Sequence, residues 1–317
     1  MSGSLEPVTD LAIVSVSFNT RDLLADCLVS ALAGLERSAL SGELWVVDNA
    51  SADGSADMIR QRFPAVRLVA HDHNIGFAAG SNLALTHLGR STPRHVLFLN
   101  PDTRVVGDAL GQMVRFLDST PQAGVAGARL VHGDGSFQHS AFAFPGLLQI
   151  LFDFFPVHPR LLESRLNGRY PRRLYQAGRP FAVDHPLGAA LMIRAETLAQ
   201  VGGFDERFFM YCEEVDLCRR VKAAGWGVYC VPQAEIVHLV AQSTRQFRDR
   251  MFVALWRSRF LMFDKHEGAP WRWVARRLVR LGLRAERRRA AAACRRGEIS
   301  EAELQGRLTA YQEVAAL

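Results

Sequence analysis

Residues 11–17 read LAIVSVS, residues 43–47 read ELWVV, and residues 95–99 read HVLFL. Each run is short and apolar, with the β-branched or aromatic residues that are typical of a buried strand. Apolar residues recur at helical spacing between these runs. This alternation predicts an α/β fold with a mostly parallel, doubly wound sheet, whose ligands bind beyond the carboxyl ends of the strands. The series predicts strands at 11–17, 43–47, 66–70, 95–99 and 125–131, and helices at 21–33, 55–62, 77–88 and 108–117.

Polar residues follow three of the predicted strands directly. Phe18-Asn19 follows the first strand, Asp48-Asn49 the second, and Asn100-Pro101-Asp102 the run that ends at residue 99. Asp, Asn and Pro also form turns and cap helices, which explains any one of these places equally well. Because all three fall at the same end of their strands, we expect a site along the carboxyl edge of the sheet.

A second acidic segment, Glu213-Glu214-Val215-Asp216, lies far along the chain and is followed by His238. Together with Asp102, these residues offer oxygen ligands for a hard divalent cation and a carboxylate that can take a proton. The alternative is structural: the acids stand in the first turn of a helix, where the helix dipole favours them, and the histidine is packed. In such a helix Asp216 would pair with Arg219 or Arg220.

The composition bounds the class of protein. A chain of 317 residues with 49% hydrophobic residues can bury a large core, enough for one domain and an appendage. The five cysteines are odd in number and lack the short paired spacing of zinc sites, which indicates a reducing compartment. The sequence contains neither a signal-peptide pattern nor a long uncharged apolar run. We therefore expect a cytoplasmic protein that does not span a membrane.

Positive charge is concentrated near the end of the chain. The net charge is +6, and residues 245–296 hold 16 Arg or Lys against 4 Asp or Glu. This composition predicts a basic amphipathic helix that binds an anionic membrane surface, or else a helix packed on the protein or on a partner. Nucleic acid is not expected, because no reading motif accompanies the charge. The predicted apolar face consists of Trp271, Val274, Leu278, Leu281 and Ala285.

Residues 141–180 differ in composition from the segments around them. Apolar residues crowd its first half and arginines its second, and four prolines argue against one long helix. We interpret the segment as an irregular insertion beside the site. It either packs as core with a solvated edge or holds a lipid-linked or phosphate-bearing acceptor, since arginine suits phosphate oxygens.

An ordered series of motifs resembles the family 2 glycosyltransferases. The donor-half motifs are VSFN (16–19), VDNAS (47–51) with DGS (53–55), NIGFAAGSN (74–82) and LNPDT (99–103). The acceptor-half motifs are GAALMIR (188–194), VGGFDE (201–206) and EEVDL (213–217). Each motif alone is weak, but their order is specific, and the resemblance extends over residues 11–245.

The resemblance implies a GT-A fold, with a Rossmann-like sheet flanked by helices, and transfer with inversion by single displacement. It implies a catalytic domain at residues 1–245, with a donor half at 11–131 and an acceptor half at 132–245 that contains the insertion 141–180. The basic helical region then occupies residues 246–317.

The resemblance also assigns donor-binding roles. Ser17 and Phe18 line the base pocket, where Phe18 replaces a tyrosine that usually stacks on the pyrimidine, and Asp48 accepts the ring N–H of uracil or thymine. Asp102 ligates Mg²⁺ or Mn²⁺, because it is the second acid of the family's metal motif. The remaining donor-binding residues are Asn19, Asn74, Gly76, Asn82 and Asn100, the last of which replaces the first acid of that motif.

His238 resembles a downstream histidine that approaches the metal and the diphosphate, so it is expected to bind the metal together with Asp102. Glu214 stands where the family usually has an aspartate that acts as general base, so it is expected to take the proton of the acceptor hydroxyl. The extra methylene requires a site set back slightly, because reacting groups must meet at about 3 Å. Gly188, Glu213 and Asp216 are expected on the acceptor side, with Glu213 as the rival base.

The motifs are most similar to bacterial rhamnosyltransferase-like members that build cell-surface polysaccharides. This similarity favours dTDP-L-rhamnose as donor, ahead of galactofuranose, N-acetylhexosamine or glucose on a uridine carrier. The acceptor would be a lipid-linked or polysaccharide precursor, with the enzyme bound peripherally to the inner face of the cell membrane. Two alternatives are a non-catalytic glycan-binding relative and a nucleotidyltransferase, although the latter normally has a Gly-rich loop where this chain has Phe18-Asn19-Thr20-Arg21.

Overall fold

The computed structural model describes residues 9–88, 93–239 and 248–317, and these form two compact units. The first unit contains residues 9–88, 93–142, 172–209 and 213–239. The second contains residues 143–171, 210–212 and 248–317. The domain boundary expected at residue 245 lies outside the described residues.

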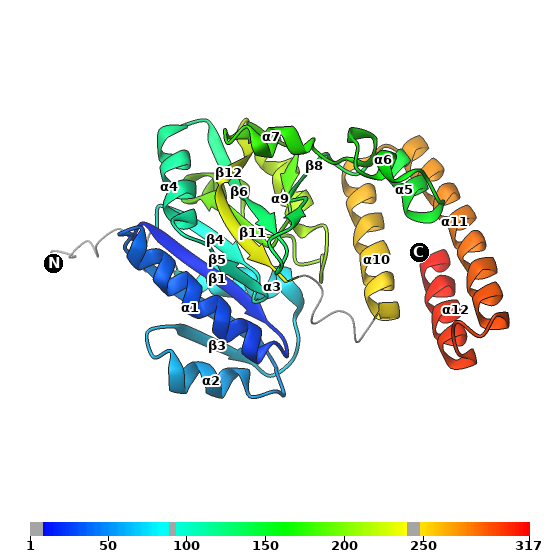
Figure 1. The fold of residues 1–317 in the computed structure, drawn as a ribbon, viewed down its shortest axis with the longest axis horizontal. Helices are drawn as coiled ribbons and strands as arrows, with labels where there is room; N and C mark the ends of the chain where they lie inside the picture. The colour runs from blue at the N-terminus through cyan, green and yellow to red at the C-terminus, as the bar shows by residue number, and fades with distance from the viewer. Residues whose placement is uncertain (1–8, 89–92, 240–247) are drawn as a thin grey trace. The chain divides into compact units, whose positions relative to one another are not determined.

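The first unit is built on one large sheet (Figure 1). Its strands follow the order β3-β2-β1-β4-β11-β6-β12-β5. β3, β2, β1 and β4 run parallel, β11 runs antiparallel to both of its neighbours, and β12 runs parallel to β6. The predicted α/β fold class is therefore confirmed, although neither β11 nor its antiparallel direction was predicted. The bounds are β1 Leu11–Ser17, β2 Gly42–Asn49, β3 Arg67–His71, β4 His95–Leu99, β5 Thr103–Val105, β6 Ala123–Val131, β11 Ala190–Arg194 and β12 Gly227–His238.

Short strands complete the first unit. β7 (Phe137–Gln138) pairs with β6, and β9 (Phe181–Ala182) pairs with β12. β8 (Ala141–Phe142) and β10 (His185–Pro186) form a separate two-stranded sheet. The helices of this unit are α1 Arg21–Arg37, α2 Ser55–Arg62, α3 Gly76–His87, α4 Ala109–Ser119, α7 Arg172–Gln176, α8 Ala195–Val201 and α9 Glu213–Ala223.

The sheet is buried on both faces, and β4 shows how. Leu97 and Leu99 belong to the core that the sheet forms with α1, α2 and α4. Phe98 points the other way, because side chains alternate along a strand. Its ring lies 4.7 Å from that of Phe204, which in turn lies 5.7 Å from Phe77 of α3. Burial on both faces explains why these strands read as continuous apolar runs in the sequence.

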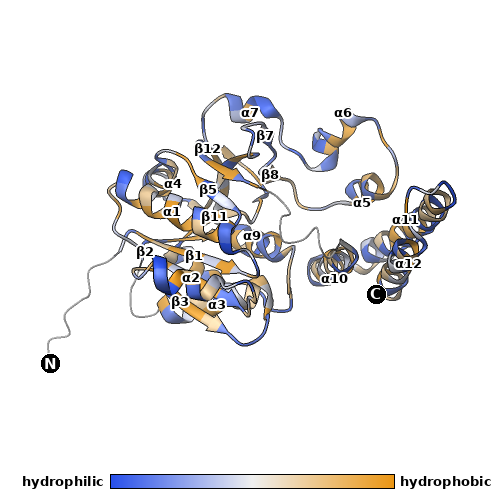
Figure 2. Cartoon of the chain, turned by 60° about the horizontal axis from the view of Figure 1, so that its bottom comes forward, coloured by the Kyte–Doolittle hydropathy of each residue, from blue (hydrophilic) through white to orange (hydrophobic). Residues whose placement is uncertain are grey.

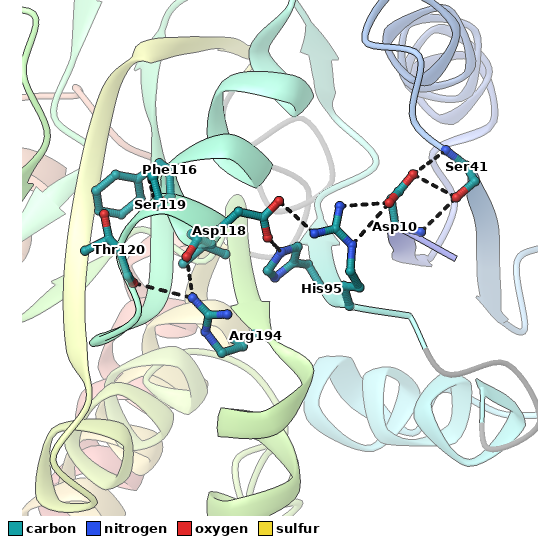
Figure 3. A network of polar contacts seen from close by, with 10 residues as sticks. Asp10, Ser41, His95, Phe116, Asp118, Ser119, Thr120 and Arg194 are labelled. Atoms are coloured by element: carbon teal, nitrogen blue, oxygen red, sulfur yellow. Dashed lines mark hydrogen bonds and ion pairs between the residues drawn. The ribbon is translucent and has the colours of Figure 1, made fainter. Parts of the chain in front are cut away.

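A polar network fixes the edge of the sheet where β1 and β4 begin (Figure 3). Arg94 donates to Asp10 at 2.8 Å and to Asp118 at 2.7 Å, and His95 Nε2 lies 2.9 Å from Asp118. Asp10 also accepts hydrogen bonds from Ser41, which precedes β2. The network therefore ties three strands and α4 together at the edge opposite to the predicted site.

The second unit is mainly helical. It contains α5 Leu147–Phe154, α6 Pro159–Leu162, α10 Arg248–His266, α11 Ala269–Arg295 and α12 Glu301–Ala316. Trp256, which is 1% exposed, stacks on Phe154 with 5.0 Å between the ring centroids. The short helices α5 and α6 agree with the prediction that prolines prevent one long helix in the insertion. Across the described residues, no helix is both long enough and apolar enough to cross a membrane.

The tail is helical as predicted, but the predicted apolar face of α11 is only partly buried. Trp271, Val274, Leu278 and Ala285 are half-buried, and the Trp271 ring lies 4.7 Å from the Phe263 ring. Leu281 is 50% exposed, and the buried stripe consists instead of Ala275, Val279, Gly282, Leu283 and Ala290. This stripe packs against α5 and α12. Its small residues permit a close approach, since a Cβ on Gly282 would lie 2.1 Å from Phe154 Cγ. A stripe of alanine and glycine gives little hydrophobic signal, and for that reason the larger side chains misled the prediction.

We expect Phe98→Ala to lower the free energy of unfolding by about 3–5 kcal/mol, because it leaves a cavity between the sheet and α3. Val29→Ala, at a position of α1 that is 52% exposed, should change it by less than about 0.5 kcal/mol. Urea unfolding followed by circular dichroism measures both variants. Equal unfolding midpoints would contradict the two-faced packing of β4.

Candidate active site

The predicted site residues gather at one edge of the sheet. The parallel strands β1, β2 and β4 end at Ser17, Asn49 and Leu99, and the polar residues follow there. β12 ends at the same edge, because His238 pairs with Thr103, the residue after Asp102. The acceptor half reaches this edge through β11, since the Asn100 amide donates to the Ala189 carbonyl at 2.9 Å.

A buried carboxylate lies at the end of β2. Asp48 is 3% exposed and stands in register with Ser17, which is fully buried. Its Oδ2 accepts the Ser51 amide at 3.1 Å, whereas its Oδ1 has no hydrogen-bond partner among the described residues. Buried polar atoms are normally satisfied, so this oxygen is available to a donor group of a ligand. The Ser17 hydroxyl, in contrast, is hydrogen-bonded to Thr20 at 2.9 Å.

Asn19 connects the loops after β1 and β2. Its backbone lies in the left-handed region with φ 52°, which asparagine tolerates better than most residues. Its amide donates to the Ser51 hydroxyl at 2.9 Å, and its side-chain oxygen accepts the Ala52 amide at 2.8 Å. Asn19 therefore shapes the rim around Asp48, while Phe18 beside it is half-buried.

The loop between β3 and α3 requires glycine at position 76. Gly76 has φ +85°, and a Cβ there would lie 2.3 Å from the Phe209 carbonyl oxygen. Asn74 accepts the Gly76 amide at 2.9 Å, and Asn49 donates to the Gly76 carbonyl at 3.0 Å. These contacts fix the loop next to the end of β2.

The side-chain amide of Asn82 forms its hydrogen bonds with other residues of the protein. Its side-chain oxygen accepts the Phe204 amide at 2.9 Å, and its nitrogen donates to the Phe204 carbonyl at 2.8 Å and to Glu206 at 2.9 Å. This residue thus ties α3 of the donor half to the acceptor-half motif around Phe204. A direct contact with the donor stays a prediction.

Asp102 and His238 are the residues that could share a cation. His238 Nε2 lies 3.5 Å from Asp102 Oδ1, and both side chains are largely buried. An octahedral cation with ligands at about 2.1 Å separates neighbouring ligand atoms by roughly 3 Å, so the pair fits one ion. No third His, Cys, Asp or Glu of the described chain joins this pair. Water and phosphate oxygens would complete such a site, as is usual for Mg²⁺.

Gln138 is a residue that the sequence gave no reason to select. It lies on the two-residue strand β7, and its side-chain nitrogen is 3.0 Å from His238 Nδ1. Its Oε1 is buried without a partner in the described part of the chain. Turning the Gln138 amide by 180° would let its Oε1 accept a hydrogen bond from the Nδ1–H of His238. The Nε2 lone pair of His238 would then face Asp102. In that orientation Gln138 would hold His238 in the tautomer whose Nε2 can bind a cation.

Glu213 and Glu214 begin α9 in different surroundings. Glu213 is 7% exposed, and its Oε2 has no partner among the residues described. Burial raises the pKa of Glu213 well above its usual value, and the charge of Glu214 raises it further. Burial raises the pKa of Glu214 to about 7. A carboxyl group with a pKa of about 7 can accept a proton near neutral pH, so Glu214 has the acid–base property that a general base needs.

The acceptor-half residues lie around Glu214. A Cβ on Gly188 would be 3.5 Å from Glu214 Cγ, so the glycine lies directly beside the glutamate. Asp216 is fully buried and accepts a hydrogen bond from Arg220 at 2.9 Å, one of the two predicted pairings. Arg220 also donates to the carbonyls of Val201 and Gly203. Asp216 therefore anchors α9 to the segment after α8.

The carboxyl edge of this open α/β sheet carries a buried carboxylate with one unpaired oxygen, a carboxylate–histidine pair and a glutamate with a raised pKa. Such a combination is typical of enzymes that act on phosphorylated or nucleotide substrates. Comparison with known proteins narrows this class. The model of the family described as glycosyl transferase family 2 matches residues 12–186. The chain belongs to this family and is a glycosyltransferase that takes its sugar from a nucleotide sugar.

Individual relatives are consistent with this assignment. The chain is 32% identical over 304 residues to N-acetylglucosaminyl-diphospho-decaprenol L-rhamnosyltransferase of Mycobacterium tuberculosis, covering 88% of this chain and 96% of that protein. It is 26% identical over 183 residues to rhamnosyltransferase WbbL of Escherichia coli, covering 56% and 66%. The mannosyltransferase PcManGT from Pyrobaculum calidifontis, solved in complex with GDP-Man and Mn²⁺, shares the fold with a TM-score of 0.56 and 18% identity, covering 99% of this chain and 87% of that one.

We expect kcat/KM to fall about tenfold per pH unit below an apparent pKa near 7, because the base must be deprotonated and burial raises the pKa of Glu214 to about 7. Glu214→Gln should lower kcat by roughly 10²–10⁴ and abolish this limb of the profile. Glu214→Asp should keep part of the rate. A Gln variant with an unchanged acidic limb would assign the base to Glu213 or Asp216.

The same pKa has a consequence for stability. The folded-state pKa of Glu214 lies above the ordinary value of 4.5, so folding favours the protonated form. This contribution is present in full below about pH 4.5 and is lost as the pH rises through about 7. Thermal unfolding should therefore show Glu214→Gln gaining stability relative to the wild type between pH 5 and pH 8.

Proposed function

We propose that this glycosyltransferase moves L-rhamnose from dTDP-L-rhamnose to a hydroxyl of a lipid-linked glycan precursor, with inversion, in the presence of Mg²⁺ or Mn²⁺. The match to the mycobacterial rhamnosyltransferase supports the choice of sugar and acceptor, because it extends over nearly the full length of both proteins. The acceptor named for that relative is a polyprenyl diphosphate carrying N-acetylglucosamine. We infer that the enzyme works peripherally at the inner face of the cell membrane.

The unpaired Oδ1 of Asp48 supports a thymine or uracil base. That oxygen is buried at the end of β2 and can accept one hydrogen bond from a ring N–H. Without such a donor, a buried carboxylate oxygen carries a desolvation cost that nothing in the described residues offsets. Asn100 at the end of β4 would contact the ribose or a water of the cation.

Asp102 and His238 would hold the cation, and the bound ion would neutralise the charge that develops on the diphosphate leaving group. Glu214 takes the proton of the acceptor hydroxyl as the oxygen attacks the anomeric carbon. The bond from that carbon to the diphosphate oxygen breaks, and the diphosphate keeps the electron pair. Attack opposite the leaving group inverts the anomeric centre. Burial and the neighbouring Glu214 both raise the pKa of Glu213, which disfavours a second negative charge beside the proposed base.

The observation that carries the proposal is that the Asp102–His238 pair and the buried Asp48 lie at the same edge of the sheet. We expect transfer of rhamnose to a synthetic polyprenyl diphosphate N-acetylglucosamine acceptor, detected by mass spectrometry, with the product anomer assigned by NMR. EDTA or Asp102→Ala should remove at least about 99% of the turnover, and added Mn²⁺ should restore only the EDTA-treated enzyme. Full activity of Asp102→Ala would reject the metal role.

Matched reactions separate the alternatives. In one series, UDP-glucose or UDP-N-acetylglucosamine replaces dTDP-L-rhamnose. A higher rate with either of them would reject rhamnose as the transferred sugar. A reaction without acceptor measures hydrolysis of the donor. Release of dTDP at the same rate with and without acceptor would show a hydrolase instead of a transferase.

Gln138→Leu should weaken binding of Mn²⁺ in the presence of dTDP by roughly 10–100-fold, the usual cost of losing a group that orients a metal ligand. Gln138→Glu should retain most of the affinity, because a carboxylate oxygen can accept Nδ1–H. Isothermal titration calorimetry measures the affinity without turnover. Thr86→Ala, an exposed position of α3, is the control; a Leu variant that binds Mn²⁺ as tightly as this control would refute the orienting role.

A further inference from the structure

One side of α11 is exposed and strongly basic. The arginines at 277, 280, 284, 287 and 288 are exposed, and they lie on the side opposite to the buried stripe. At 3.6 residues per turn, these positions and two exposed apolar residues fall within about 120° of the helix circumference. We call this set the arginine face: Trp273, Arg277, Arg280, Leu281, Arg284, Arg287 and Arg288.

Among the described residues, no acidic side chain is paired with the arginines of the arginine face. Other arginines of α11 are paired, since Arg276 binds Asp264 at 3.0 Å and Arg289 binds Glu286 at 2.6 Å. Within the described residues, the five arginines of the arginine face form no ion pair. Glu286 is the one acidic residue of α11, and Figure 2 shows extensive blue along this helix. The face therefore presents a dense positive charge to an external anion.

Two large apolar side chains stand among these charges. Trp273 is 61% exposed and Leu281 is 50% exposed, so neither is used for packing. The Arg277 guanidinium lies 5.1 Å from the centre of the Trp273 ring. Tryptophan and arginine together suit the boundary between lipid headgroups and acyl chains, where the ring is half-inserted and the guanidinium stays at the phosphates.

We propose that the arginine face of α11 binds the surface of a bilayer rich in anionic phospholipid. Five unpaired arginines match phosphate charge, and the exposed tryptophan and leucine account for a hydrophobic contribution that a purely electrostatic partner would not need. The proposal rests on the proposed function in one respect: a lipid-linked acceptor brings the reaction to a membrane. It does not depend on which sugar is transferred.

Flotation of the full-length protein with vesicles tests the proposal. Vesicles of phosphatidylcholine with 30% phosphatidylglycerol should bind the protein at least about tenfold better than pure phosphatidylcholine, and raised salt should release it. Arg280→Gln with Arg284→Gln should weaken binding by roughly 25-fold, at about fivefold for each arginine. Trp273→Ala should weaken it while leaving the salt dependence. Arg280→Lys with Arg284→Lys, which keeps both positive charges, should bind as the wild type does.

The matched control is Arg62→Gln with Arg67→Gln, two exposed arginines of the first unit that change the net charge equally. If this control loses as much binding as the α11 variant, or if binding ignores the anionic lipid, the proposal is overturned. Tighter binding of the same face to duplex DNA or RNA than to vesicles would also overturn it. Circular dichroism confirms that each variant is folded.

Transfer assays separate this proposal from the function itself. With a short-chain, water-soluble acceptor, the Arg280→Gln and Arg284→Gln enzyme should keep wild-type turnover. With acceptor embedded in anionic vesicles it should lose most of its rate at low enzyme concentration. If the protein binds vesicles but transfers no sugar, membrane binding by the arginine face is supported and the proposed function is rejected. If it transfers sugar but binds no vesicles, the proposed function is supported and membrane binding is rejected.

Discussion

The hydrogen bond from the Asn100 amide to the Ala189 carbonyl, 2.9 Å long, joins the two halves of the site. β4 ends at this point, and β11 starts beside it in the opposite direction, with Ala190 paired to Leu99. Because β11 is antiparallel, its first residues lie at the carboxyl edge of the parallel strands. Gly188 precedes them, and a Cβ at this position would be in van der Waals contact with Glu214. The position of Glu214, the proposed base, relative to Asp102 therefore depends on the direction of one strand.

Local sequence patterns were sufficient to predict the strands of the donor half, but they did not predict β11 or its direction. β1 and β4 were predicted with their correct bounds, because strands buried on both faces are continuous apolar runs between turn residues. β11 has the same kind of sequence, and nothing in an apolar run specifies whether its neighbours run parallel or antiparallel. Gln138 was missed for a related reason: a two-residue strand has no periodicity, and its partner His238 lies 100 residues away.

The acidic segment shows why a motif alone does not assign roles. In the sequence Glu213, Glu214 and Asp216 are equally good first-turn acids of a helix. In the structure Asp216 is fully paired with Arg220, Glu213 is buried with an unsatisfied oxygen, and Glu214 lies beside Gly188. Burying a carboxyl without a partner costs free energy, and this cost is tolerated chiefly where an altered pKa is useful. The environment of each acid, which only the tertiary structure supplies, distinguishes the proposed base Glu214 from the structural anchor Asp216.

The composition of the proposed cation site implies that binding of the cation and binding of the nucleotide sugar are coupled. Asp102 follows β4 and His238 ends β12, so the two ligands come from segments more than a hundred residues apart, and the described residues supply no third ligand of the usual kind. Two protein ligands hold Mg²⁺ or Mn²⁺ weakly, and phosphate oxygens of the donor must complete the coordination. Cation and nucleotide sugar then raise each other's affinity by the same factor, as linkage requires. An enzyme built in this way binds its cation firmly only when a donor is present.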